Sequence, residues 1–160
     1  MNAAETLAIP ELRAFVAELA ADPERWRHRV RHDPQQRVFE RLVEEPHMEA
    51  WLICWMPGHD TGFHDHDLSS GAVTVVSGAV QEERLGLART TSRIYTPGQT
   101  FDFTASEIHR VTHTGDVGAV TLHAYSPRLR RMGAYAVTRE GALQRHPVGY
   151  GEELRPVTAA

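Results

Sequence analysis

From about Arg37 onward the chain breaks into short runs rich in Val, Ile, Thr, Tyr and Trp, and glycine or proline separates most of these runs. Runs of this composition and length are typical of β-strands. Turn signals such as residues 77–78 (Ser-Gly) and 96–98 (Thr-Pro-Gly) lie between them, where hairpins or loops are expected. This pattern predicts an all-β sandwich or barrel over residues 37–138.

The residues on either side of this region have a different character. Apolar residues at positions 12, 15, 16 and 19 follow the spacing of one helical face, with Pro10 suited to the first turn. A second short helix fits Pro23 to His32, because Asp33-Pro34 would end it. We therefore expect a single domain over residues 1–160. In it a segment with two short α-helices (1–35) precedes the barrel, and an irregular tail (139–160) follows it.

The composition argues against two classes of partner. The chain has 160 residues with 17 Lys+Arg against 21 Asp+Glu, a formal charge of −4, which does not favour nucleic acid. No apolar run approaches the roughly 20 residues of a membrane-spanning helix, and the first residues lack the pattern of a signal peptide. We therefore expect a cytoplasmic protein with no nucleic-acid or membrane partner. We also expect a monomer, because no unexplained apolar helix face remains.

Cysteine usage limits the kind of metal site that the chain could form. Cys54 is the one cysteine in the sequence, so neither an intrachain disulfide nor a cysteine-based zinc cluster is possible. Its place in an apolar run next to Trp55 favours a packed small hydrophobic residue over a nucleophile. Any metal must therefore be held by carboxylates or by some of the 10 histidines.

Two of these histidines, His64 and His66, are one residue apart in a run expected to be a strand over residues 62–67. Alternate side chains of a strand face the same way, so both imidazoles would project from one face and Asp65 from the other. Two imidazoles aimed at one point can chelate a divalent metal. The alternative is a pair of buried, hydrogen-bonded core histidines.

The surroundings of this pair resemble the two sequence motifs of the cupin family. Five residues separate Gly58 from His64, as in the first motif, and "YTPGQTFDFTASEIHRVTH" is similar to the second motif, with His109 as its histidine. The resemblance implies a cupin (jelly-roll-like) β-barrel with a metal bound by His64, His66 and His109. Many cupins add a glutamate a few residues later, but Gly71 stands at that position here. The implied site therefore has three neutral imidazoles and open coordination positions.

Four segments narrow the resemblance further. In chain order, "LICWMPGH", "FHDHD", "IHRVTH" and "LHAYSP" resemble the cysteine dioxygenase (thiol dioxygenase) family in its bacterial form, over roughly residues 37–135. The resemblance implies Fe(II) as the metal and O₂ as co-substrate. It also implies a line of three residues on one strand face, in which Tyr125 and His123 are catalytic and Thr121 supports them. Tyr125 should be unmodified, because Gly71 stands where mammalian members have the cysteine that cross-links to this tyrosine.

The family uses an arginine on an early strand to bind the substrate carboxylate, since a guanidinium makes two parallel charge-assisted hydrogen bonds. Arg41 is the first candidate, and Arg37, which shares its strand parity, is the alternative. His123 and Tyr125 could instead serve barrel packing alone.

The function implied is the oxidation of a small-molecule thiol substrate, L-cysteine, by O₂ to cysteine sulfinic acid. Three alternatives stay open. The substrate could be 3-mercaptopropionate or another small thiol; the protein could be a three-histidine cupin with different chemistry on a small metabolite; or it could be a binding or sensor domain without activity.

Overall fold

Strands are the main secondary structure in the computed structural model, which describes residues 5–159. The helical elements are α1 (Ile9–Ala20) and two 3₁₀ turns, η1 (Pro23–Arg25) and η2 (Arg27–Arg29). The strands are β1 (Val38–Glu44), β2 (Glu49–Trp55), β3 (His64–Asp65), β4 (Ser70–Ser77), β5 (Ala79–Arg84), β6 (Thr91–Tyr95), β7 (Thr100–Phe103), β8 (His109–Thr114), β9 (Ala119–Ser126), β10 (Arg131–Val137) and β11 (Leu143–Gly149).

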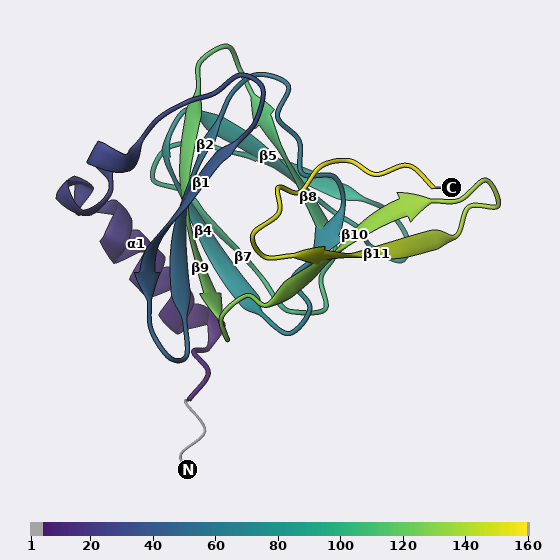
Figure 1. Cartoon of the computed structure of the whole chain (residues 1–160), viewed down its shortest axis with the longest axis horizontal. Coiled ribbons are helices and arrows are strands. Elements are labelled where there is room, and N and C mark those ends of the chain that lie inside the picture. Colours follow the sequence, from purple (N-terminus) through teal and green to yellow (C-terminus); the bar gives the residue numbers. More distant parts are fainter. Residues whose placement is uncertain (1–4, 160) are drawn as a thin grey trace.

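The strands form two antiparallel sheets that face each other (Figure 1). One sheet has five strands in the order β1-β2-β9-β4-β7, and the other has six in the order β11-β10-β3-β8-β5-β6. Buried apolar side chains from both sheets pack together between them, among them Trp55, Val73, Phe103, Val111 and Met132. The expected all-β sandwich is confirmed.

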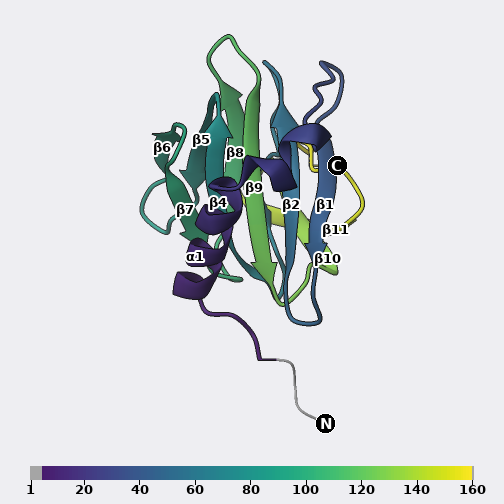
Figure 2. The ribbon, with the colours of Figure 1, turned by 90° about the vertical axis from the view of Figure 1, so that its left-hand side faces the viewer.

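Helix α1 covers the outer face of the five-stranded sheet (Figure 2). Its apolar stripe, Leu12, Val16 and Leu19, is buried where α1 lies on β4 and β9, in a cluster that includes alternate residues of β9. Cys54 belongs to this outer layer and is 1% exposed, as expected of a packed small hydrophobic residue. Because side chains alternate along a strand, the residues between those facing α1 must point inward, toward the second sheet.

Two segments differ from the expectation. Residues 23–32 form the turns η1 and η2 with i→i+3 hydrogen bonds, not an α-helix, and none of their side chains is buried. A segment without a buried apolar face gains little from packing, which is what stabilises most short helices. The expected irregular tail contains β11, which pairs with β10 from Leu143 to Gly149. Pro147 is tolerated there because β11 is the edge strand of its sheet.

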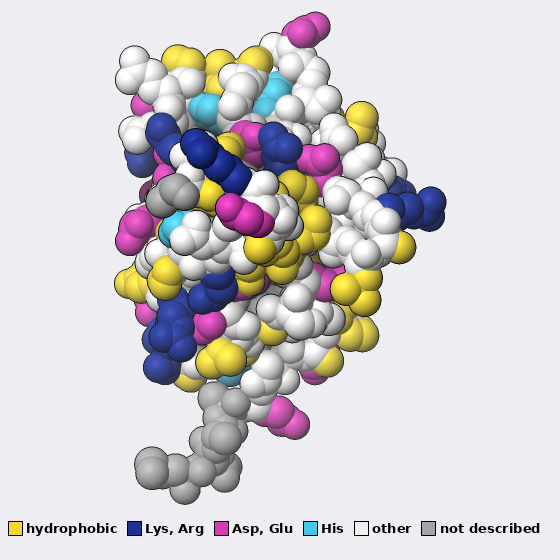
Figure 3. Space-filling model, turned by 90° about the vertical axis from the view of Figure 1, so that its right-hand side faces the viewer, with side chains coloured by type: hydrophobic (Ala, Val, Ile, Leu, Met, Phe, Trp, Pro, Cys, Tyr) yellow, Lys and Arg dark blue, Asp and Glu magenta, His cyan; other side chains and the backbone are white. Residues whose placement is uncertain are grey.

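The face of the molecule that carries the β10–β11 hairpin has a mixed surface. Figure 3 shows acidic and basic side chains interspersed on it. Two arginines of these strands form ion pairs with acids near β3: Arg145 with Asp65 at 2.8 Å and Arg131 with Asp67 at 2.8 Å. Within the described residues, no helix has both the length and the apolar character that crossing a membrane would need.

The contact between α1 and the sheet leads to a stability prediction. Leu12 is 0% exposed, so Leu12→Ala leaves a cavity and should lower the free energy of unfolding by about 2–5 kcal/mol. Leu87→Ala is the matched control, because the Leu87 side chain is fully exposed, and it should change stability by less than about 0.5 kcal/mol. Equilibrium urea denaturation measures both, and equal effects would contradict the packing of α1.

Candidate metal centre

The three histidines expected as metal ligands lie together between the sheets. His64 on β3 is directly opposite His109 on β8, and His66 follows one residue beyond the end of β3. One nitrogen from each ring lies within 4.8 Å of those of the other two. All three side chains are buried, at 2–3% exposure. The sandwich therefore brings one predicted group together from two separate sequence motifs.

Hydrogen bonds orient two of these rings. His64 Nδ1 donates to the Gly62 carbonyl at 3.0 Å, and His109 Nδ1 donates to a Glu82 carboxylate oxygen at 2.8 Å. With the hydrogen on Nδ1, each ring keeps a lone pair on Nε2. Metal-binding histidines commonly donate their other nitrogen to a carbonyl or carboxylate in this way.

Two buried nitrogens of these three rings, His66 Nδ1 and His109 Nε2, have no hydrogen-bond partner among the described residues. A buried polar atom left unpaired costs about 1–3 kcal/mol, so such atoms usually have a role. A metal ion bound by the three rings would satisfy nitrogens of this cluster. The residues therefore fit a metal ion, and imidazole ligands suit Fe, Zn, Cu or Ni.

The electrostatic surroundings keep these rings neutral. Burial lowers the pKa of His64 to about 4, and burial together with repulsion from the neighbouring histidines holds the pKa values of His66 and His109 well below their usual range. Neutral imidazoles are the form that binds metals. Burial raises the pKa of Glu82, although the adjacent Arg84 guanidinium opposes this effect.

Sequence reasoning missed Glu82, the hydrogen-bond partner of His109. It is 3% exposed and accepts a hydrogen bond from Arg84 Nε at 2.9 Å. The one available signal is the position of Glu82 two residues after the apolar Val80 on β5. Residues two apart on a strand share a face, so Glu82 lies on the same buried face as Val80.

The expected line of Thr121, His123 and Tyr125 forms a hydrogen-bonded chain on the inner face of β9. Trp55 Nε1 donates to the Thr121 hydroxyl at 2.9 Å, which leaves that hydroxyl's hydrogen free for His123 Nε2 at 2.7 Å. His123 Nδ1 lies 3.1 Å from the Tyr125 hydroxyl oxygen. Burial lowers the pKa of His123 to about 3, and burial raises that of Tyr125, so both are neutral near pH 7.

Gly71 faces the same region from β4. A Cβ there would lie 2.4 Å from Phe103 Cζ and 3.0 Å from Tyr125 Cδ1, closer than real contacts allow. The Phe103 ring fills this space and packs on His66 and His109, with ring centroids 4.3 Å and 4.4 Å apart. The space beside the histidines that a side chain at position 71 would need is therefore taken by an apolar ring.

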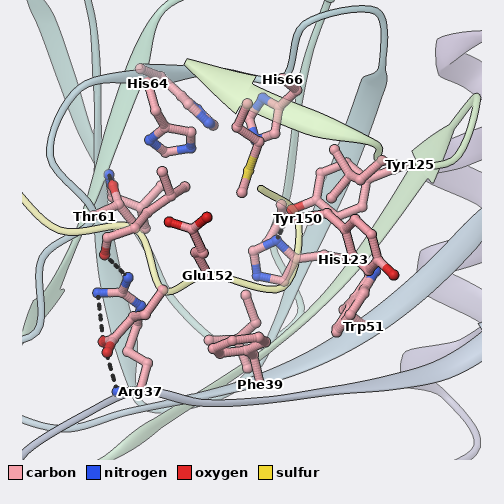
Figure 4. Close-up of a pocket in the computed structure, with 18 of the residues that line it drawn as sticks. Arg37, Phe39, Trp51, Thr61, His64, His66, His123, Tyr125, Tyr150 and Glu152 are labelled. Atoms are coloured by element: carbon pink, nitrogen blue, oxygen red, sulfur yellow. Dashed lines mark hydrogen bonds and ion pairs between the residues drawn. The ribbon is translucent and has the colours of Figure 1, made fainter. Parts of the chain in front are cut away.

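A pocket opens beside the three histidines (Figure 4). His123 and Tyr125 line it, and so do Phe39, Trp51 and several other apolar side chains. Four further lining residues, Tyr150, Glu152, Glu153 and Leu154, come from the tail that was expected to be irregular. Sequence reasoning missed these four, because no pattern in the tail shows that it folds back onto the barrel.

The two candidate arginines differ in position. Arg37 lines the pocket and is 6% exposed, and burial lowers its pKa to about 10. Arg41 is not among the lining residues. Its guanidinium lies over the Trp51 ring and forms ion pairs with Glu44 at 3.0 Å and Glu49 at 3.4 Å. The structure thus brings Arg37 to the pocket and leaves Arg41 outside it.

Comparison with solved structures supports the fold. A cupin superfamily protein from Desulfitobacterium hafniense superposes with a TM-score of 0.55 at 11% identity, over 64% of this chain and 87% of that protein. The protein TT1209 from Thermus thermophilus gives a TM-score of 0.57 at 20% identity, over 64% of this chain and 93% of that protein. The two-sheet sandwich is therefore a cupin fold.

Sequence comparison identifies the family as well as the fold. Human cysteine dioxygenase type 1 is 26% identical over 139 residues, which cover 78% of this chain and 68% of the human protein. The bovine enzyme of the same name is 27% identical over 139 residues. The family described as Cysteine dioxygenase type I matches residues 2–138, nearly the whole chain. The chain belongs to the cysteine dioxygenase type I family.

Proposed function

We propose that the protein is an iron-dependent thiol dioxygenase that oxidises L-cysteine with O₂ to cysteine sulfinic acid. The observation that carries this proposal is the convergence of three neutral imidazoles, from His64, His66 and His109, in the pocket that Tyr125 also lines. Membership of the family supports an oxidoreductase of this class. Fe(II) held by the three histidines would supply the electron-transfer chemistry that lets O₂ react with a thiolate.

The pocket supplies the conditions that this reaction needs. Three neutral ligands leave the charge of a divalent ion uncompensated, which favours an anionic sulfur over a neutral thiol. Apolar walls, including Phe39, Trp51 and Ile53, reduce the amount of water near the reacting atoms. Both features favour binding of a small thiol in its thiolate form.

Tyr125 is the residue proposed to contact the reactants. Its hydroxyl is neutral and buried, so it can donate a hydrogen bond to the sulfur or to oxygen beside it. His123 holds the hydroxyl oxygen in place, and Thr121 in turn holds His123. Arg37 replaces Arg41 as the first candidate for the substrate carboxylate, because Arg37 lines the pocket.

Other expectations stay as predictions. These are a single domain over residues 1–160, a monomeric state, a cytoplasmic location, and the absence of a nucleic-acid partner.

Oxygen uptake tests the proposed reaction. Protein loaded anaerobically with Fe(II) should consume one O₂ per cysteine sulfinate when it is given oxygen and L-cysteine, as measured with an oxygen electrode and mass spectrometry. His109→Ala should abolish uptake and lower the bound iron. His113→Ala is the matched control, because His113 lies on the same strand outside the metal-binding group.

The same assay with 3-mercaptopropionate separates the alternatives. Oxygen uptake with 3-mercaptopropionate but not with L-cysteine would support thiol oxidation with 3-mercaptopropionate as the substrate. No uptake by iron-loaded protein with either thiol would refute the thiol dioxygenase and favour other chemistry in a cupin pocket.

Removal of one hydroxyl tests the role of Tyr125. Tyr125→Phe keeps the ring that packs near His66 and Phe103 but removes the hydrogen-bond donor. A lost hydrogen bond to a charged group is worth about 1.5–3 kcal/mol, so kcat should fall by about 10- to 150-fold at unchanged iron content. Tyr95→Phe is the control, because Tyr95 is buried outside the pocket. An unchanged kcat in Tyr125→Phe would assign this ring to packing alone.

The buried histidines make the metal-free protein sensitive to mild acid. Burial lowers the folded-state pKa of His64 to about 4 and that of His123 to about 3, whereas an unfolded chain titrates near about 6.5. Between these values the unfolded chain binds more protons, so the free energy of unfolding decreases as the pH falls from about 6.5 to about 4. Each such histidine should lower this free energy by about 2 kcal/mol between about pH 7 and pH 5.

Urea denaturation of the metal-free protein at these two pH values measures the loss. His123→Asn should reduce the difference between the two pH values, and His28→Asn, at an exposed position, should not. If His123→Asn loses as much unfolding free energy between the two pH values as the wild type, His123 is not neutral and buried in the folded protein.

A further inference from the structure

His66 differs from the other two histidines of the metal centre in how its ring is held. His64 and His109 each donate a hydrogen bond from Nδ1, one to a carbonyl and one to a carboxylate. His66 Nδ1 has no such partner within residues 5–159. The Phe103 ring contacts its face, with the centroids 4.3 Å apart, but supplies no hydrogen bond to a ring nitrogen. The direction of the His66 nitrogens therefore depends on the backbone that carries the side chain.

That backbone is held by a turn, which the Asp65 side chain closes. Strand β3 ends at Asp65, so His66 lies outside the strand pairing. Asp65 Oδ1 accepts a hydrogen bond from the Asp67 N–H at 2.9 Å, the usual contact of an aspartate with the backbone two residues on. Asp67 has a φ of 56°, in the left-handed region that aspartate tolerates better than most residues. The Asp65 carboxylate thus links the residues on both sides of His66.

Arg145 on β11 holds this carboxylate in place. Its Nε donates to Asp65 Oδ2 at 2.8 Å and its Nη2 donates to Oδ1 at 2.9 Å, while the Tyr135 hydroxyl donates to Oδ2 at 2.5 Å. Asp65 is 7% exposed, so these contacts replace water around a buried charge. Two parallel hydrogen bonds from a guanidinium fix the orientation of a carboxylate as well as neutralising it. Arg145 therefore controls how Oδ1 faces the Asp67 N–H.

The strand between these residues leaves room for the contact. β10 lies between β11 and β3, so the Arg145 side chain crosses β10 to reach Asp65. Gly133 on β10 is directly opposite Asp65, and a Cβ there would lie 2.1 Å from Arg145 Nε. A larger residue at position 133 would push the guanidinium away from the carboxylate. Arg145 itself lies beyond residue 138, where the family match ends.

We propose that Arg145 is a positioning residue of the metal centre. Through the Asp65 carboxylate it holds His66 where its imidazole converges with those of His64 and His109. Strand β11 then belongs to the metal centre although it supplies no ligand. The inference rests on the metal site of the proposed function but on no step of thiol oxidation.

The sign of the effect distinguishes positioning from simple electrostatics. A guanidinium repels a nearby metal cation, so removal of its charge alone would strengthen metal binding. Loss of the contact that orients a ligand weakens metal binding instead. Weaker binding in a variant that lacks Arg145 is therefore evidence for positioning.

Co(II) binding tests the proposal, because imidazoles bind Co(II) and its visible absorption depends on the number and arrangement of its ligands. Arg145→Met should raise the dissociation constant of Co(II) about tenfold, the lower end of the range for residues that orient metal ligands. Arg13→Met is the matched control. Arg13 has a similar exposure (42% against 35%) and pairs with Asp102 at 2.6 Å, but it lies on α1. It should leave the dissociation constant unchanged.

The same substitution in His66→Ala tests the route through His66. Once this ligand is absent, Arg145→Met should cause no further change in the dissociation constant, because its effect depends on His66. At saturating Co(II), the visible spectrum of Arg145→Met should move from that of the wild type toward that of His66→Ala. Equal weakening with and without His66 would overturn the proposal, since Arg145 would then act through overall stability.

Two milder variants keep the positive charge. Gly133→Ala should displace the guanidinium, and Arg145→Lys cannot make two parallel hydrogen bonds. Both should weaken Co(II) binding, and both remain informative if Arg145→Met does not fold. Urea denaturation identifies the variants that are folded under the assay conditions, and unchanged Co(II) binding in those folded variants would overturn the role of Arg145.

These outcomes are independent of the proposed reaction, because no measurement uses oxygen or a thiol. Weaker Co(II) binding in Arg145→Met would support its positioning role even if the iron-loaded wild type oxidised no thiol. Equal dissociation constants in the wild type and Arg145→Met would overturn that role and leave thiol oxidation standing. A wild type that binds no Co(II) would overturn the metal centre and this inference together.

Discussion

The site depends on the complete burial of strand β9. All eight of its residues are buried, so every polar group that it carries must find a partner inside the protein. Val120, Leu122 and Ala124 pack in the layer that contains α1, whereas Thr121, His123 and Tyr125 face the other sheet and satisfy one another in a line. Trp55 closes one end of that line, and the other end lies in the pocket. The same alternation thus builds the core and positions the tyrosine hydroxyl.

Burial has a second consequence at the three histidines. Removing imidazoles from water lowers their pKa values and leaves nitrogens such as His109 Nε2 without a partner, which destabilises the metal-free fold. The same two effects prepare the rings for a metal, because they are neutral and their lone pairs converge. Stability without the metal and readiness to bind it therefore oppose each other at His64, His66 and His109.

Side-chain alternation and motif spacing in the sequence predicted the strands, the group of three histidines and the polar face of β9. They could not separate Arg37 from Arg41, because the two have the same strand parity and differ only in which tertiary neighbours surround them. Glu82 was missed for the same reason, since its partner His109 is distant in the sequence. The pairing of β11 lies in a segment whose composition is poor in strand signals, so only contact with β10 stabilises it.

The tail and the barrel are joined at one buried charge. Arg37 needs partners for its guanidinium because it is 6% exposed, and the tail provides them through the Leu154 carbonyl and the Glu153 carboxylate. This requirement holds residues 150–154 against the pocket, while the metal ligands are fixed separately by pairing between β3 and β8.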